Sequence, residues 1–271
     1  MDKKRHDDHL VRPDNGRVVT ANPWQELRRF TPARIALGRT GVSLPTRPHL
    51  EFQLAHAQAR QAVQQPADFC LLDSELQALG ESVVLLRSAA DSRAVYLQRP
   101  DLGRRLDAAS AELLAELGAD GDGQPPDVVI VIGDGLSSRA INSHAVPLLQ
   151  VLLPALHEQH WRVGPLVLVK HARVAVGDEV GAKLRASLVV VLIGERPGLS
   201  SPDSLGIYMT WQPRVGTTDD LRNCISNIRP QGLSYPMAVH RLLYLMTQAR
   251  KLRLSGVALK DNTDTESLPG G

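Results

Sequence analysis

The chain has 271 residues, of which 43% are hydrophobic and 22% are charged. This length and composition are typical of a globular protein with one sizeable core, and they argue against disorder throughout. The 31 basic and 29 acidic side chains nearly cancel, and only 4% of the residues are aromatic. The composition therefore disfavours proteins that bind nucleic acid or an anionic membrane surface.

Three features of the sequence indicate the compartment. Residues 1–16 are polar and lack the apolar stretch of a secretory signal. The longest apolar run, residues 188–193, is too short to span a bilayer. Cys70 and Cys224 lie far apart and outside any zinc-ligand spacing, which is typical of reduced thiols. We therefore expect a soluble, cytoplasmic protein that supplies no metal ligands.

The N-terminal part of the chain is predicted to be helical. Residues 1–20 carry no apolar period and are predicted to form a flexible segment. Asn22 and Pro23 form a plausible N-cap and first-turn pair. Residues 38–48 contain two glycines and two prolines and are expected to form a loop before a helix over 49–64. We predict a small helical module over residues 21–80.

From residue 81 short apolar runs alternate with helical patterns. The predicted strands cover residues 82–86, 94–97, 128–132, 166–170, 188–193 and 207–211, with the first two as a hairpin and the last as the final strand. The predicted helices cover residues 102–117, 137–160, 177–186 and 236–252. Strands separated by helices indicate βαβ units, which form an open parallel sheet. The domain should span residues 81–258, with a flexible tail over 259–271.

Ligands of open α/β sheets bind beyond the carboxyl ends of the strands, so the residues after each strand are candidate site residues. The run Gly133-Asp134-Gly135-Leu136-Ser137 permits close backbone approach to a ligand at a helix N-terminus. It is also compatible with an ordinary turn between a strand and a helix. It is neither a P-loop nor a complete GxGxxG motif, which weakens a nucleotide-binding interpretation.

Two later segments are further candidates. Glu195 and Arg196 stand at a predicted strand end, where Glu195 could accept a hydrogen bond from a ligand amide or form a surface ion pair. Cys224 lies in a short polar stretch predicted to be another post-strand loop, and a buried inert thiol is the favoured interpretation there. The histidines do not cluster, and no HExxH motif, catalytic triad or paired carboxylates stand out. The sequence therefore predicts a binding subunit with no catalytic residues of its own.

Several segments together resemble the small subunit of ethanolamine ammonia-lyase. They are LRR from Leu27, TPARIALGRTG from Thr31, RPDLGRRL from Arg99, DGLS from Asp134, GERPGL from Gly194 and CISNI from Cys224. Each motif alone is weak, but they occur in the order of that family and cover most of residues 23–255.

The resemblance implies a Rossmann-like domain over residues 81–258 after the helical module. It also implies a hetero-oligomeric lyase that uses adenosylcobalamin to convert ethanolamine to acetaldehyde and ammonia, with the substrate site on a large TIM-barrel subunit. By resemblance the contacts of this chain with the cofactor are Val174, Glu195 and Cys224. The sequence lacks an Asp-x-His-x-x-Gly motif, which suggests that cobalamin keeps its own dimethylbenzimidazole ligand. The family also implies a location that includes bacterial microcompartments.

The sequence leaves two other functions open. A stand-alone nucleotide-binding oxidoreductase would need a complete GxGxxG motif and a ribose-binding acid about 20 residues later. A non-catalytic interaction module would use its apolar helical faces and the arginines near residues 28–39 as an interface only. Stabilisation by NAD rather than by cobalamin would favour the first of these.

Overall fold

The computed structural model describes residues 18–119 and 124–263. The chain divides into two compact units, one up to Gln58 and one from Ala59 onward. The predicted boundary near residue 80 and the predicted helical module over 21–80 stay predictions. None of the described helices is long and apolar enough to cross a membrane.

The first unit contains the 3-10 helix η1 (Pro23–Arg29) and most of the helix α1 (Thr46–Gln64). The side chain of Asn22 caps η1 by accepting a hydrogen bond of 2.9 Å from the backbone N–H of Trp24, as its type and position predicted. Thr20 and Arg39 exchange backbone hydrogen bonds of 2.8 and 3.1 Å across the intervening loop. Of residues 18–58, only Pro45 and Ala55 are buried. This unit therefore has no hydrophobic core of its own.

The second unit is built on one six-stranded mixed sheet in the order β1-β3-β2-β4-β5-β6. The strands are β1 (Val83–Arg87), β2 (Val128–Gly133), β3 (Leu166–Lys170), β4 (Leu188–Gly194), β5 (Leu205–Trp211) and β6 (Arg222–Ile228). The four strands from β1 to β4 are parallel, whereas β5 and β6 pair antiparallel.

The prediction of a wholly parallel sheet was therefore wrong at β5 and β6. The segments before these strands, residues 195–204 and 212–221, are too short for the crossover that a parallel connection needs, about a dozen residues or more. The α/β class is confirmed, and the assignment as Rossmann-like stays a prediction.

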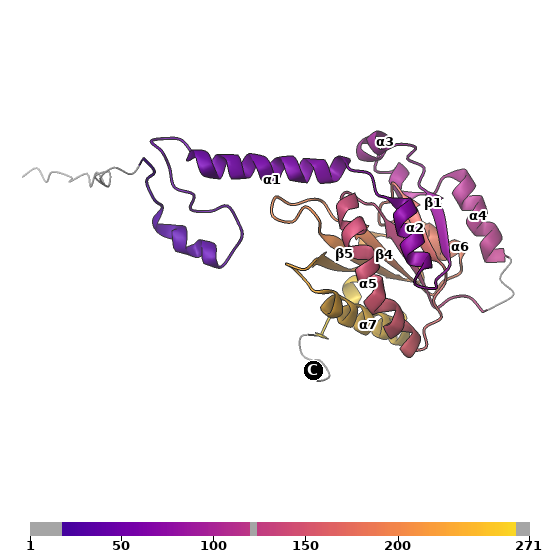
Figure 1. The fold of residues 1–271 in the computed structure, drawn as a ribbon. Helices are drawn as coiled ribbons and strands as arrows, with labels where there is room; N and C mark the ends of the chain where they lie inside the picture. The colour runs from indigo at the N-terminus through magenta and orange to yellow at the C-terminus, as the bar shows by residue number, and fades with distance from the viewer. Residues whose placement is uncertain (1–17, 120–123, 264–271) are drawn as a thin grey trace, which may run out of the picture. The chain divides into compact units, whose positions relative to one another are not determined.

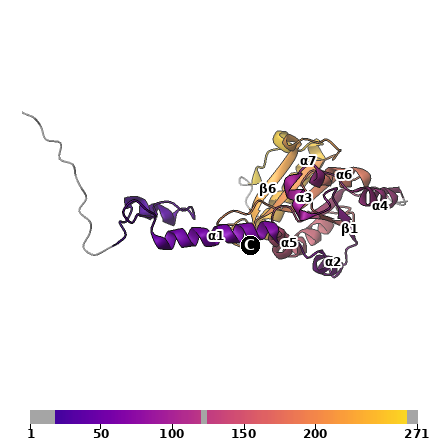
Figure 2. The same cartoon turned by 90° about the horizontal axis from the view of Figure 1, so that it is seen from above.

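Helices cover both faces of this sheet (Figure 1). On one face pack α2 (Phe69–Gln77), α5 (Ser138–Glu158) and α7 (Tyr235–Leu252). Figure 1 shows α5 and α7 side by side, and Figure 2 shows α2 beside α5. On the other face pack α4 (Ala108–Ala119) and α6 (Val176–Lys183).

The residues of β2 alternate between the two cores. Val128, Ile130 and Ile132 belong to the first core, and Val129 and Val131 to the second. This double burial confirms the interpretation of the unbroken apolar run as an interior strand.

The strand predicted as the last, over residues 207–211, is followed by β6, and two other predicted elements also differ in the structure. Residues 94–97 form part of the helix α3 (Arg93–Gln98), not a strand, because Ser92 caps a helical turn and Tyr96 is buried. The helix expected over 102–117 is broken into the 3-10 helix η2 (Leu102–Arg104) and α4. The break occurs where Leu106 bridges to Ser88 and Asp107 caps the new helix by accepting from the N–H of Ser110 at 2.8 Å.

Candidate functional site

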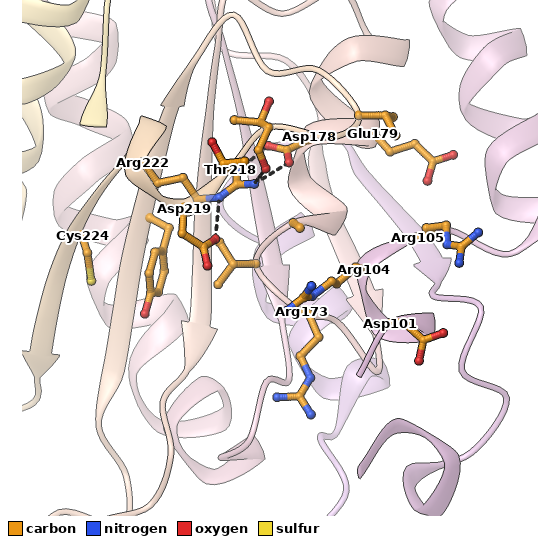
Figure 3. Close-up of a pocket in the computed structure, with 16 residues that line it drawn as sticks. Asp101, Arg104, Arg105, Arg173, Asp178, Glu179, Thr218, Asp219, Arg222 and Cys224 are labelled. Atoms are coloured by element: carbon orange, nitrogen blue, oxygen red, sulfur yellow. Dashed lines mark hydrogen bonds and ion pairs between the residues drawn. The ribbon is translucent and has the colours of Figure 1, made fainter. Parts of the chain in front are cut away.

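A cavity of about 1050 Å³ lies beside β5 and β6 on the α6 side of the sheet (Figure 3). It is bounded by η2, the loop after β3, the start of α6 and the loop between β5 and β6. Its lining residues are Asp101, Arg104, Arg105, Arg173, Val174, Ala175, Asp178, Glu179, Tyr208, Val215, Gly216, Thr217, Thr218, Asp219, Arg222 and Cys224. Two of the three predicted cofactor contacts, Val174 and Cys224, therefore face one space.

The loop that carries Val174 is held by backbone hydrogen bonds from three directions. The N–H of Ala172 donates to the carboxylate of Asp134 at 2.9 Å, and the carbonyl of Ala172 accepts from the hydroxyl of Tyr96 at 3.0 Å. The N–H of Arg173 donates to the carbonyl of Gly103 at 2.7 Å. With both backbone groups of Ala172 satisfied, Val174 is presented to the cavity by a constrained segment.

Burial explains the electrostatics of Asp134 behind this loop. Removal from water raises the pKa of the Asp134 carboxyl, while the positive charge of Arg93 and the hydrogen bond from Ala172 act to lower it. Arg93 lies 3.3 Å from the carboxylate and is its ion-pair partner. Asp134 is thus a structural anchor for the loop after β3, a role that its position in a glycine-rich turn did not reveal.

Cys224 lies in the middle of β6, directly opposite Tyr208 in β5. The prediction that it sits in a post-strand loop was wrong, because residues 222–228 form an edge strand. The thiol is exposed toward the cavity, yet the surrounding protein displaces part of its water and raises its pKa. A hydrogen bond from the Tyr208 hydroxyl lowers the pKa of the thiol, and the negative charge of Glu195 raises it.

Glu195 follows β4 directly, so its predicted place at a strand end is confirmed. Its Oε2 accepts hydrogen bonds from the hydroxyl of Ser204 and, at 3.3 Å, from the N–H of Asn227. Among the described residues none donates to Oε1, which leaves one carboxylate oxygen available to a ligand. Glu195 is outside the cavity lining, but its charge acts on Tyr208 and Cys224.

The glycine-rich turn after β2 is in contact with other segments of the protein. Gly135 has φ +57°, and a Cβ there would lie 2.2 Å from the carbonyl oxygen of Gly194. Arg93 donates to the carbonyl of Gly135 at 2.7 Å, and the hydroxyl of Ser137 donates to the carbonyl of Pro202 at 2.8 Å. The close approach that glycine permits is therefore made to β4, as expected for a structural turn.

Residues that the sequence did not single out make up much of the cavity. Arg222 is buried and donates to both carboxylate oxygens of Asp178, at 2.6 and 2.7 Å. Tyr208 forms part of the lining next to Cys224. The arginines of the RPDLGRRL segment were noted as a motif without a role. Across residues 18–119 and 124–263, no group of three or more His, Cys, Asp or Glu side chains could hold a metal ion.

Comparison with known proteins identifies the family of the chain. Residues 21–260 match the family model described as ethanolamine ammonia-lyase light chain (EutC). An ethanolamine ammonia-lyase small subunit from Pseudomonas aeruginosa is 57% identical over 98% of this chain and 95% of its own length. One from Ralstonia nicotianae is 56% identical over 96% of each chain, and one from Azotobacter vinelandii is 57% identical over 93% of each. The chain therefore belongs to the ethanolamine ammonia-lyase light-chain family, also named the small-subunit family.

Proposed function

We propose that the chain is the small subunit of an adenosylcobalamin-dependent ethanolamine ammonia-lyase, which forms acetaldehyde and ammonia from ethanolamine. The observation that carries the proposal is the family match over residues 21–260, together with a cavity that both Val174 and Cys224 line. In this proposal the domain over residues 81–258 contacts the cofactor, and a large subunit supplies the substrate site.

The chemistry of the cavity, together with that of Glu195 outside its lining, fits a corrinoid. A corrin is a broad apolar macrocycle with amide side chains, so it needs apolar contact and polar groups around it. Val174 offers apolar contact, and the thiol of Cys224 tolerates a tight one. The Oε1 atom of Glu195 can accept from an amide N–H in a charge-assisted hydrogen bond.

When bound, adenosylcobalamin supplies a cobalt–carbon bond whose homolysis starts the radical chemistry. The residues of this chain bind and orient: Asp134 and Tyr96 fix the loop of Val174, and Ser204 and Asn227 orient Glu195. No proton or group transfer is assigned to them. Catalytic groups belong to the large subunit in this proposal.

The first unit is proposed to bind the large subunit. Apolar side chains that a core would normally bury are exposed there, among them Trp24 at 66%, Phe30 at 73% and Leu54 at 61%. Residues 18–58 also carry five arginines against two glutamates. An apolar, positively charged surface without a core of its own fits a protein partner with apolar grooves edged by carboxylates. A second copy of this unit would present the same positive charge and fits less well.

A cytoplasmic location, including packaging in a bacterial microcompartment, belongs to the same proposal. It follows from the family and not from the fold. Residues 1–17, which make up most of the predicted flexible N-terminal segment, lie outside the described residues.

The test is reconstitution. The chain alone should release no ammonia from ethanolamine, whereas a mixture with the large subunit and adenosylcobalamin should form acetaldehyde, detected by coupled oxidation of NADH. The same mixture without the chain is the control. A mixture that binds the cofactor and still forms no acetaldehyde would remove the assigned reaction. Stabilisation of the chain by NAD would instead support the oxidoreductase, which the filled turn at Gly135 disfavours.

A further inference from the structure

One wall of the cavity carries three arginines with no carboxylate partner. Arg104 and Arg105 come from η2 and the residue after it, and Arg173 comes from the loop after β3. In the part of the chain that the structure describes, none of the three forms an ion pair. In Figure 3 these three arginines lie on one side of the view and Arg222 lies on the other. We call these three residues the arginine wall.

The acidic side chains near this wall already have partners. Asp101 forms an ion pair with Arg99 at 2.7 Å, and Glu179 accepts from the N–H of Leu106 at 2.9 Å. Neither carboxylate forms an ion pair with the arginine wall, although the charge of Arg105 helps to lower the pKa of Asp101. Like charges gathered beside a cavity raise one another's energy, and an anion in the cavity would relieve this repulsion.

Arg222, on the other side of the cavity, differs from these arginines because its guanidinium has several hydrogen-bond acceptors within the protein. Its guanidinium donates to Asp178, to Asp219 at 3.3 Å, to the hydroxyl of Thr210 at 3.2 Å and to the carbonyl of Thr217 at 2.7 Å. With this many acceptors it has little capacity for a ligand. Its role is structural, and it is not part of the arginine wall.

Arg173 is the best positioned member of the arginine wall. Its Nε is buried and has no hydrogen-bond partner, and its Nη2 makes a single long bond of 3.3 Å to the carbonyl of Tyr96. Its guanidinium lies 4.2 Å from the centre of the Tyr96 ring, while Arg93 lies 4.8 Å from that centre. Arg93 is neutralised by Asp134, whereas Arg173 is not. A half-buried guanidinium that is held against a tyrosine ring, with an unsatisfied Nε and no carboxylate partner, fits an anionic ligand.

We propose that the arginine wall binds the phosphodiester of the nucleotide loop of cobalamin, with Arg173 as its principal contact. The inference rests on the proposed function, because cobalamin is the ligand. A planar guanidinium suits a phosphate, to which it can donate two parallel hydrogen bonds. The phosphodiester is the anionic group of an otherwise amide-fringed molecule, so it would fix which way round the corrinoid enters the cavity.

The experiment uses the complex of this chain with its large subunit and three ligands. Adenosylcobalamin has the phosphodiester and the base, cobinamide has neither, and cobinamide phosphate has a phosphate without the base. Their dissociation constants are measured from visible absorbance for wild type and Arg173→Met, which keeps the apolar stem beside Tyr96 and Gly103. Arg60→Met, at an exposed arginine of α1 outside the cavity lining, is the matched control.

The Arg173→Met change should weaken binding of both phosphate-bearing ligands by about 10- to 150-fold and leave cobinamide within about twofold. Unchanged cobinamide binding also shows that the variant is folded. An equal loss for all three ligands, or no loss for any, would overturn the inference. If the arginine wall instead bound an anion that is not part of the corrinoid, Arg173→Met would change the affinities for all three ligands equally or not at all. If the wild-type complex binds no corrinoid at all, the proposed function fails instead.

Discussion

Arg222 and Asp178 form a buried two-point ion pair that joins the strand carrying Cys224 to the helix that follows Val174. Both side chains are almost inaccessible to solvent, at 3% and 2% exposed. The carbonyl of Thr217 also accepts from Arg222, so the loop between β5 and β6 is held by the same guanidinium. This pair therefore sets the spacing of the cavity walls.

Replacing one partner of this pair should be strongly destabilising. Arg222→Met leaves the Asp178 carboxylate buried without its counter-charge, which should lower the free energy of unfolding by about 3–5 kcal/mol. Urea unfolding measures it. The double variant Arg222→Met with Asp178→Leu should recover most of the loss, since no unpaired charge remains. A double variant as unstable as the single one would show that the pair is not the cause.

The electrostatic link between Glu195 and Cys224 can be measured by alkylation. Because Cys224 has a raised pKa, its reaction with iodoacetamide in a Cys70→Ser background should be slow at pH 8.5 and should accelerate at higher pH. Glu195→Gln removes a negative charge that raises the thiol pKa, so the rate at pH 8.5 should increase. Glu51→Gln, at a remote position on α1, is the control. An unaltered rate in Glu195→Gln would exclude the link.

Acid stability should depend on Asp127. Burial raises the pKa of this carboxyl, but hydrogen bonds from Arg162 at 2.6 and 3.1 Å and the charge of Arg250 outweigh burial and lower it. A lowered folded-state pKa means that the stabilisation is complete above the ordinary value and is lost as the pH falls through the folded value. Asp127→Asn should cost about 1 kcal/mol at pH 7.

The difference between Asp127→Asn and wild type should shrink as the pH falls from about 5 toward 3. Unfolding in urea across that range provides the comparison, with Asp91→Asn at an exposed carboxylate as the control. A difference that stays constant with pH would assign the effect to something other than ionisation.

The first unit should contribute to association and not to the stability of the isolated chain. Trp24→Ala with Phe30→Ala removes two exposed rings, so the melting temperature of the chain alone should change little. Binding to the large subunit, measured by sedimentation or calorimetry, should weaken by about 10-fold or more. Val257→Ala, at an exposed position of the second unit, is the control. Unaffected binding together with adsorption of the wild-type chain to anionic vesicles would indicate a membrane-binding surface instead.

The central strands could be predicted because their sequences carry an unbroken signal. Residues 128–132 and 188–193 are continuous apolar runs, and both faces of each strand are buried. The strand β6 has no such run, since only Arg222, Ile225 and Ile228 are buried in it. Residues 94–97 were predicted as a strand but form part of a helix. Their β-branched and aromatic residues suggested a strand, but capping by Ser92 favoured a helix.

The site could be predicted only in part, because some of its residues are placed by local sequence and others by tertiary contacts. Glu195 follows an apolar strand and could be placed from the rule for open sheets. The cavity itself depends on contacts between distant segments, such as Gly103 with Arg173 and Asp178 with Arg222. Such contacts leave no mark in local spacing. The arginine wall could not be predicted from the sequence, because the tertiary structure determines whether an arginine has an ion-pair partner.

Binding of the cofactor in this cavity is tested most directly by titrating the complex with adenosylcobalamin and following visible absorbance. Wild type should bind saturably, and Val174→Asp, which places a carboxylate in the cavity, should bind at least about 10-fold more weakly. Val257→Asp, outside the cavity lining, should bind like wild type. Equal affinity of Val174→Asp and wild type would contradict the claim that this cavity receives the cofactor.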